Sequence, residues 1–105
     1  MSSMESRQRA FEAHFAFTEE MAFSVATYRN RLLGLWAGEL MGLSGGALDA
    51  YAQDVLHQSL TPREAMDPVD RVCRDLMAKG VSASPEDVRS RLQDCGMTAA
   101  ARLAA

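Results

Sequence analysis

The sequence has few of the residues that mark an exported, metal-binding or membrane-spanning protein. Only two cysteines occur, Cys73 and Cys95, which is too few for a disulfide framework or a zinc motif. Small buried thiols are the simplest interpretation, and a redox-sensitive pair is the alternative. The apolar runs are far shorter than the roughly 20 residues that cross a bilayer, and no signal-peptide pattern is present. We therefore expect a cytoplasmic protein with no direct membrane insertion.

An excess of positive charge is also missing. The chain carries 11 Lys and Arg against 14 Asp and Glu, a net charge of −3, so neither nucleic acid nor an anionic lipid surface is an expected partner. The balance of 48% hydrophobic and 24% charged residues is ordinary for a globular protein. A chain of 105 residues forms one domain and buries roughly 65% of its unfolded surface. One modest core is expected.

Catalytic and ligand-binding patterns are weak. The two histidines, His14 and His57, lie on different predicted helices, with no Ser or Cys at a spacing typical of a triad. Glu19 and Glu20 are adjacent, and adjacent side chains on a helix point about 100° apart. The GLSGG segment, residues 42–46, lacks the Lys-Ser/Thr pair and the preceding strand of a P-loop. We expect no enzyme, no cofactor and no metal site.

The spacing of apolar residues predicts helices throughout the chain. A first stripe recurs every three or four residues and ends at Gly42, after which Ser44 is a plausible N-cap. Its members are Met21, Val25, Tyr28, Leu32, Leu35, Trp36 and Leu40. We expect Trp36 to be largely buried against the second and third helices. The second helix ends near Gln58, before Pro62, and its stripe is Leu48, Tyr51, Ala52, Val55 and Leu56.

Two further helices begin at a capping residue followed by proline, Asp67-Pro68 and Ser84-Pro85. Their apolar stripes are Val69, Val72, Cys73, Leu76 and Met77 in the third helix and Val88, Leu92 and Cys95 in the fourth. Gly80 and Gly96 are predicted to end them, leaving residues 97–105 as a weak helix or a frayed tail. The fold class is therefore all-α, a small four-helix bundle.

The predicted helices differ greatly in length. The first, from about Met4 to Met41, would measure about 57 Å, whereas the other three would measure roughly 21, 18 and 17 Å. The N-terminal part of the first helix therefore has nothing in the bundle to pack on, although it is rich in phenylalanine: Phe11, Phe15, Phe17 and Phe23. We predict a mobile N-terminal arm over 1–20, which projects or is disordered until a partner binds. The bundle would occupy 21–96 and a C-terminal tail 97–105.

Three stretches resemble a known family: RQRAFEAHFA, YRNRLLGLWAGELMGLSGGALDAYA and DRVCRDLMAKGV. They are similar to the zeta subunit family of alphaproteobacterial ATP synthases, small helical inhibitors of ATP hydrolysis by the F1 sector, over about Arg7 to Leu92. The resemblance implies that the arm inserts as a helix between the catalytic alpha and beta subunits and reaches toward the gamma subunit, the rotor, while the bundle stays outside. It also implies a chain that associates with the inner membrane only peripherally, through F1, and we expect a monomer when it is free.

Carried over to this sequence, the arm of the family falls on the partner-binding candidates Arg7, Arg9, Phe11, Glu12, His14 and Phe15. Gln8 and His14 stand where family members often carry charged residues. Two plainer interpretations remain open: a solvated helix face for the charged candidates, and Phe11 and Phe15 folded back onto the bundle. Two other functions remain open as well. One is a small helical regulatory or nucleotide-sensing binding module with weak or lost inhibitory activity, and the other is self-association through the arm.

Overall fold

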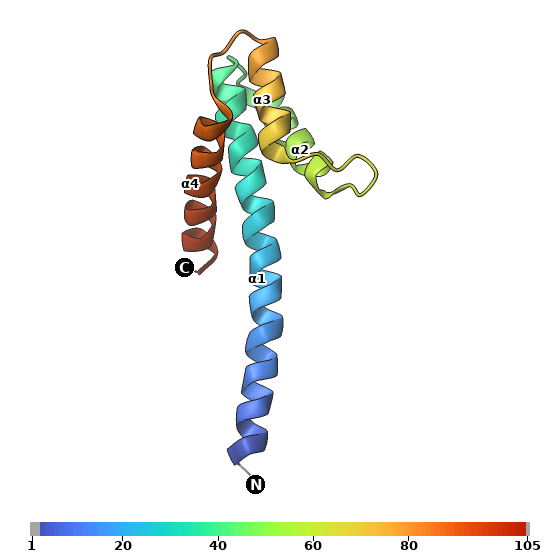
Figure 1. The fold of residues 1–105 in the computed structure, drawn as a ribbon, viewed down its shortest axis with the longest axis vertical. Coiled ribbons are helices and arrows are strands. Elements are labelled where there is room, and N and C mark those ends of the chain that lie inside the picture. The colour runs from blue at the N-terminus through green and yellow to red at the C-terminus, as the bar shows by residue number, and fades with distance from the viewer. Residues whose placement is uncertain (1–2, 105) are drawn as a thin grey trace.

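The structure, a computed structural model, describes the backbone of residues 3–104 and the side chains of residues 19–104. It contains four helices: α1 (Ser3–Leu40), α2 (Gly45–Leu60), α3 (Pro68–Ala78) and α4 (Pro85–Ala104). Within residues 3–104 all regular structure is helical, which confirms the all-α class. Successive helices run in opposite directions, with short connections at each end of the bundle (Figure 1).

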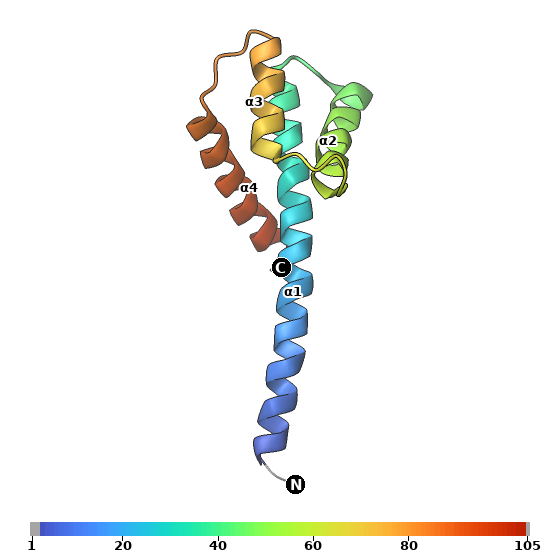
Figure 2. The same cartoon turned by 45° about the vertical axis from the view of Figure 1, so that its right-hand side comes forward.

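The first helix is the axis of the molecule. Helices α2 and α4 lie on different sides of its C-terminal half, and α3 packs across the same half (Figure 2). The N-terminal half extends beyond the ends of all three, as the length mismatch predicted (Figure 1). The molecule therefore measures 65 × 30 × 28 Å, with a radius of gyration of 17.5 Å, against about 13 Å for a compact domain of this size.

The core lies where α1 meets the other three helices. Its fully buried large side chains come from every helix: Leu33, Val55, Val72, Leu76 and Val88. The stripe predicted for the first helix is shifted, because Leu33 and Ala37 are completely buried while Leu40 remains 46% exposed. A central helix is covered over a wide arc, so its most buried line lies between its two contact faces. Three members of the predicted stripe, Leu32, Leu35 and Trp36, instead line a cavity together with residues of α4.

Small residues bring α1 and α2 into close contact. A Cβ atom added to Gly34 would lie 2.8 Å from Ala52 Cα, and one added to Gly38 would lie 2.5 Å from Leu48 Cδ1. Both distances are too short for a real Cβ contact. At Gly34 the neighbour is backbone, whereas at Gly38 it is the end of the flexible Leu48 side chain, which can rotate away. Gly34 therefore permits the close crossing of α2 over α1.

Trp36 has a neighbour that the prediction did not include. It is partly buried and packs against the core, and it also lines a cavity with residues of α4. The guanidinium of Arg91 on α4 lies over its ring, 5.2 Å from the ring centroid. Such a cation–π contact lets one edge of the ring stay in water. Trp36 thus joins α1 to α4 at the margin of the core.

The ends of α3 and the start of α4 follow the predicted capping chemistry. Asp67 Oδ1 accepts a hydrogen bond from Val69 N at 2.8 Å. Ser84 Oγ accepts from Asp87 N at 3.1 Å, and Asp87 Oδ2 accepts from Ser84 N at 3.3 Å, which is a reciprocal capping box. Gly80, with φ 72°, closes α3. Ser44 occupies the predicted N-cap position of α2, but its hydroxyl makes no capping hydrogen bond.

The predicted end of the fourth helix at Gly96 is wrong. Helix α4 continues without a break to Ala104, and Ala99 beyond the glycine is fully buried. A glycine inside a helix costs only about 1 kcal/mol relative to alanine, and packing on α1 offsets that cost. A Cβ added to Gly96 would lie 3.4 Å from Arg29 Cδ, an ordinary van der Waals distance, so the helix also passes close to α1 at this position.

Candidate partner-binding surface

The predicted arm is the part of α1 that the other helices leave uncovered (Figure 2). Its backbone is helical from Ser3, and residues 3–20 span about 27 Å at 1.5 Å per residue. All six predicted contact residues lie outside the part of the chain whose side chains the structure describes: Arg7, Arg9, Phe11, Glu12, His14 and Phe15. Their part in partner binding therefore remains a prediction. The adjoining described residues, Glu19 and Glu20, are exposed.

The junction between arm and bundle is held from two sides. On the α4 side, Arg102 Nη1 donates a hydrogen bond to the Tyr28 hydroxyl, and the Arg102 guanidinium lies 5.7 Å from the centroid of that ring. On the α2 side, the buried Asn30 donates from Nδ2 to Ser59 Oγ at 3.2 Å. These contacts tie α1 to both neighbouring helices within one turn. They fix the direction in which the helix leaves the bundle.

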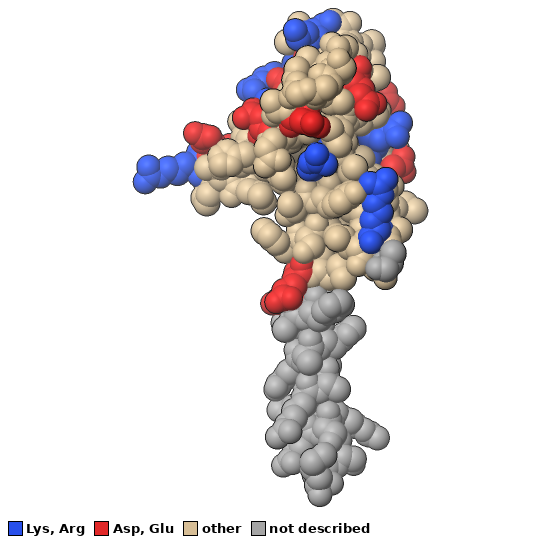
Figure 3. Space-filling model, turned by 180° about the vertical axis from the view of Figure 1, so that it is seen from behind, with Lys and Arg blue, Asp and Glu red and all other residues tan. Residues whose placement is uncertain are grey.

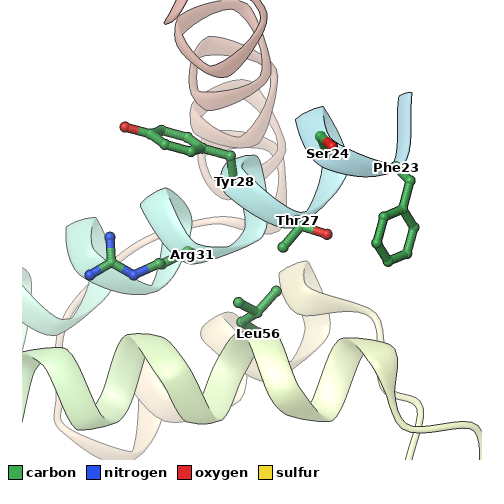
Figure 4. Close-up of a pocket in the computed structure, with 6 residues that line it drawn as sticks. All are labelled: Phe23, Ser24, Thr27, Tyr28, Arg31 and Leu56. Carbon is green, nitrogen blue, oxygen red and sulfur yellow. The ribbon is translucent and has the colours of Figure 1, made fainter. Parts of the chain in front are cut away.

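A shallow cavity of about 250 Å³ opens beside this junction, between α1 and α2. We call it the junction groove; its lining residues are Phe23, Ser24, Thr27, Tyr28, Arg31 and Leu56. In Figure 4 the Phe23 ring, the Thr27 side chain and the Leu56 side chain border the space between the two helices. Phe23 is 64% exposed. The Thr27 hydroxyl is buried and has no hydrogen-bond partner among the described residues.

A polar cluster joins α2 to α3 on another side of the bundle. Arg71 Nε donates to Asp75 Oδ2 at 2.6 Å, and Arg71 Nη2 pairs with Asp54 Oδ2 at 2.9 Å. Arg71 Nη1 also donates to Gln58 Oε1 at 2.6 Å, and the Tyr51 hydroxyl donates to Asp75 Oδ2 at 2.8 Å. The i,i+4 spacing of Arg71 and Asp75 is visible in the sequence, but their partners on α2 become apparent only in the structure.

The electrostatics of this cluster favour a structural role. Burial, followed by the hydrogen bond to Asp75, raises the pKa of Tyr51 above its usual value. Burial disfavours the charge of Arg71, but the hydrogen bonds to Asp75 and Asp54 outweigh it and raise the pKa of the guanidinium. Both groups therefore keep their protons at neutral pH. A general acid or base works best when its pKa lies near the operating pH, so this cluster is suited to holding helices together.

The two thiols are shielded from reaction in the same way. Burial raises the pKa of Cys95, and burial, followed by the charge of Asp70, raises that of Cys73. The reactive form of a cysteine is the thiolate, and a raised pKa keeps it scarce at neutral pH. Both cysteines are free, and they contribute to packing: Cys95 is 7% exposed, and Cys73 packs on the core.

The described surface offers little to a metal ion or a strongly charged partner. Among the described side chains there is no group of three His, Cys, Asp or Glu residues that could hold a metal. Acidic and basic side chains alternate over the bundle face in Figure 3. In the part of the chain that the structure describes, no helix has both the length and the apolar character required to span a membrane.

Comparison with known families identifies the chain. A family model described as ATPase inhibitor subunit zeta matches residues 1–102. The chain belongs to this family. The match covers the arm as well as the bundle, and it confirms the family indicated by the three motif stretches. No curated protein matches the chain. The ATPase inhibitor subunit zeta family is named for a regulatory activity, inhibition of an ATPase, rather than for catalysis.

Proposed function

We propose that this chain inhibits ATP hydrolysis by the F1 sector of ATP synthase by inserting the N-terminal part of α1 at a catalytic alpha/beta interface. The observation that carries the proposal is the combination of an ATPase inhibitor family match over residues 1–102 with a helix that extends far beyond its own bundle. A helix with no intramolecular cover is suited to binding in a groove of another protein. The bundle then serves as the anchor outside F1.

The physical basis of inhibition is binding energy. A rotary ATPase must open and close its catalytic interfaces in each cycle, and a helix wedged into one interface holds it in a single state. Phe11 and Phe15 lie one turn apart and supply apolar anchors. Full burial of each ring contributes about 1.5–3 kcal/mol. Arg7, Arg9 and Glu12 set the register of the helix through charge complementarity, and His14 adds a further contact.

The bundle lowers the cost of presenting this helix. An isolated helix of this length is marginal in water because its first turn is costly to form. Here the packed half of α1 has already formed that nucleus, so each further residue adds to an existing helix. The division of the chain into an arm over 1–20 and a bundle from residue 21 onward follows this logic, and the bundle includes the last turns of α4, where Ala99 is buried.

Inhibition by an inserted helix implies particular partners and a particular location for the chain. The inserted helix contacts the alpha and beta subunits, and its N-terminus points toward gamma. The chain acts in the cytoplasm, held at the inner membrane only through F1. It acts without a cofactor, as a monomer when free.

The decisive experiment measures ATP hydrolysis by cognate F1 in the presence of the full chain and of a chain lacking residues 1–18. We expect the full chain to inhibit and the truncated chain to lose inhibition. The truncated chain should keep helical circular dichroism and cooperative unfolding, because the buried residues among the described side chains all lie beyond position 29.

Two outcomes contradict this proposal. A truncated chain that inhibits as well as the full chain would move the inhibitory surface into the bundle. A full chain that is folded yet leaves hydrolysis unchanged at saturating concentration would remove the F1 inhibitor function altogether.

A further inference from the structure

We propose that the F1 contact continues past the arm into the junction groove, with Phe23 as a further anchor and the Thr27 hydroxyl as a hydrogen-bonding point. The occupant is the F1 subunit that already holds the arm. It would place an apolar side chain between Phe23 and Leu56 and a backbone polar group next to Thr27. This inference rests on the proposed function and extends the contact into the bundle.

Phe23 is an unusual residue to leave in water. It is 64% exposed and lies at the edge of the groove (Figure 4), directly before the part of α1 that the bundle covers. A phenylalanine can bury 150–250 Å², and aromatic rings are enriched among the residues that dominate binding energy at interfaces. Most of the ring surface is not buried by the rest of the chain, so a partner that covers it would gain the free energy of burying that surface.

Thr27 supplies a second, independent observation. A threonine inside a helix commonly returns its hydroxyl to a carbonyl one turn earlier, yet the Thr27 hydroxyl has no hydrogen-bond partner among the described residues although it is buried. Buried polar groups are nearly always hydrogen-bonded. Thr27 lines the groove, so a rotation of its side chain toward the groove would let a polar group of the partner satisfy this hydroxyl.

The register of α1 connects the groove to the arm. Stepping four residues at a time from the predicted arm anchors gives a single row: Phe11, Phe15, Glu19, Phe23, Thr27 and Arg31. Residues at this spacing form one of the ridges by which helices pack. The last three members of the row line the groove. A partner that follows this ridge along the arm therefore arrives at Phe23 and Thr27.

The size of the groove favours a partner that is already tethered. A stable interface buries about 800 Å² on each partner, several times what one phenylalanine can add. The groove is too small to recruit a separate protein or to form a dimer alone. For a subunit already held by the arm, the second contact is intramolecular and benefits from a high effective concentration.

The test compares inhibition of cognate F1 by the full wild-type chain, by Phe23→Ala and by the control Met97→Ala. Met97 on α4 is 73% exposed and does not line the groove, so it matches Phe23 in exposure alone. We expect Phe23→Ala to raise the half-inhibitory concentration roughly tenfold, with unchanged unfolding, while Met97→Ala behaves as wild type. Thr27→Val, which keeps the shape and deletes the hydroxyl, should raise it by a smaller factor, roughly threefold.

The outcomes separate this inference from the proposed function. If the wild-type chain inhibits and Phe23→Ala inhibits equally well, only the groove contact is overturned. If the wild-type chain does not inhibit, both proposals are overturned. A photoreactive Phe23→benzoylphenylalanine chain gives a second measurement in the assembled complex. A crosslink to the alpha or beta subunit supports the groove contact, whereas a crosslink only to a second copy or within the chain overturns it.

Discussion

The two halves of α1 form one continuous helix but differ in what surrounds them. In the C-terminal half, Leu33 and Ala37 are fully buried between neighbouring helices, whereas Phe23, before the junction, is 64% exposed. One half is held by packing and the other extends from it. Secondary structure alone therefore does not reveal where a helix obtains its stability. The covered half serves as the nucleus, and the uncovered half is a low-cost extension of it.

This comparison predicts that stability and partner binding are separable along a single helix. Substitutions in the covered half should reduce the free energy of unfolding and impair binding only through loss of folded protein. Substitutions in the uncovered half should do the reverse. The following experiments test that separation, beginning with the largest expected effect.

The largest effect is expected at the centre of the covered half. Leu33→Ala removes a completely buried side chain and leaves a cavity in the core, so it should reduce the free energy of unfolding by about 2–5 kcal/mol. The matched control is Leu40→Ala on the same helix, where the side chain is 46% exposed. It should cost much less. Urea denaturation followed by circular dichroism measures both.

These two leucines also distinguish the observed core from the predicted stripe, which contained Leu40 and omitted Leu33. Equal losses from the two substitutions would contradict the assignment of Leu33 to the core. A larger loss of unfolding free energy for Leu40→Ala than for Leu33→Ala would support the stripe predicted from the sequence.

The next effect is expected in the uncovered half. The double substitution Phe11→Ala with Phe15→Ala should weaken F1 binding by at least about 2 kcal/mol, roughly thirtyfold in affinity. The free energy of unfolding should change by less than about 1 kcal/mol, because the N-terminal part of α1 extends beyond the other three helices (Figure 1). Binding titrations on cognate F1, with parallel denaturation curves, measure the two effects. Loss of folding with unchanged binding per folded molecule would place both rings in a core.

Much of this fold could be predicted because its signals are local. The cap at Asp67 and the capping box at Ser84 depend on residues within three positions of each other. Helix length needs only the extent of the pattern, so the projection of α1 was predictable as well. The end at Gly96 was not, because the helix continues through contacts with α1, more than 60 residues away in sequence. The exposed Met77 was missed for a similar reason: the bundle covers less of α3 than its apolar stripe suggests.

The candidate surface likewise has one part that could be predicted from the sequence, the arm, and one that could not, the junction groove. The arm residues were proposed from motif similarity and from the absence of cover, both of which are visible in the sequence. The junction groove needs Leu56 of α2 to lie against α1, and the tie between Tyr28 and Arg102 joins residues 74 positions apart. Such contacts depend on how the helices cross. Gly34 permits that crossing because its neighbour is the backbone of Ala52, a contact that only the structure reveals.

A smaller effect on stability is expected from the contact between Gly34 of α1 and Ala52 of α2. Gly34→Ala should improve helix propensity by about 1 kcal/mol, but the new Cβ would meet Ala52 Cα at 2.8 Å and force the helices apart. Overpacking of this kind costs about 1–3 kcal/mol, so we expect a net loss of stability. The control is Gly46→Ala in α2, where an added Cβ meets nothing within 4 Å. Thermal denaturation should show a lower midpoint for the first variant only, and a stabilised Gly34→Ala would show that α2 can move away freely.

The smallest effect is a pH dependence within the bundle, at the Tyr51 hydroxyl that donates to Asp75. Tyr51→Phe removes this hydrogen bond and should cost about 1 kcal/mol at neutral pH. Burial, followed by the bond to Asp75, raises the pKa of Tyr51 in the folded protein above its ordinary value of 10.0. The folded chain therefore holds the phenol proton more tightly than the unfolded chain does. This stabilisation is fully present below about pH 10 and is lost as the pH rises toward the folded pKa.

The difference in stability between wild type and Tyr51→Phe should accordingly be constant up to about pH 9 and shrink by about pH 11. The raised pKa values of Cys73 and Cys95 also favour unfolding at high pH, but both proteins carry these thiols, so their contribution cancels in the comparison. Urea denaturation of the two proteins across this pH range gives the difference directly. A difference that stays constant to about pH 11 would show that the phenol proton is not coupled to folding. The α2–α3 cluster would then depend on Arg71 and its carboxylate partners alone.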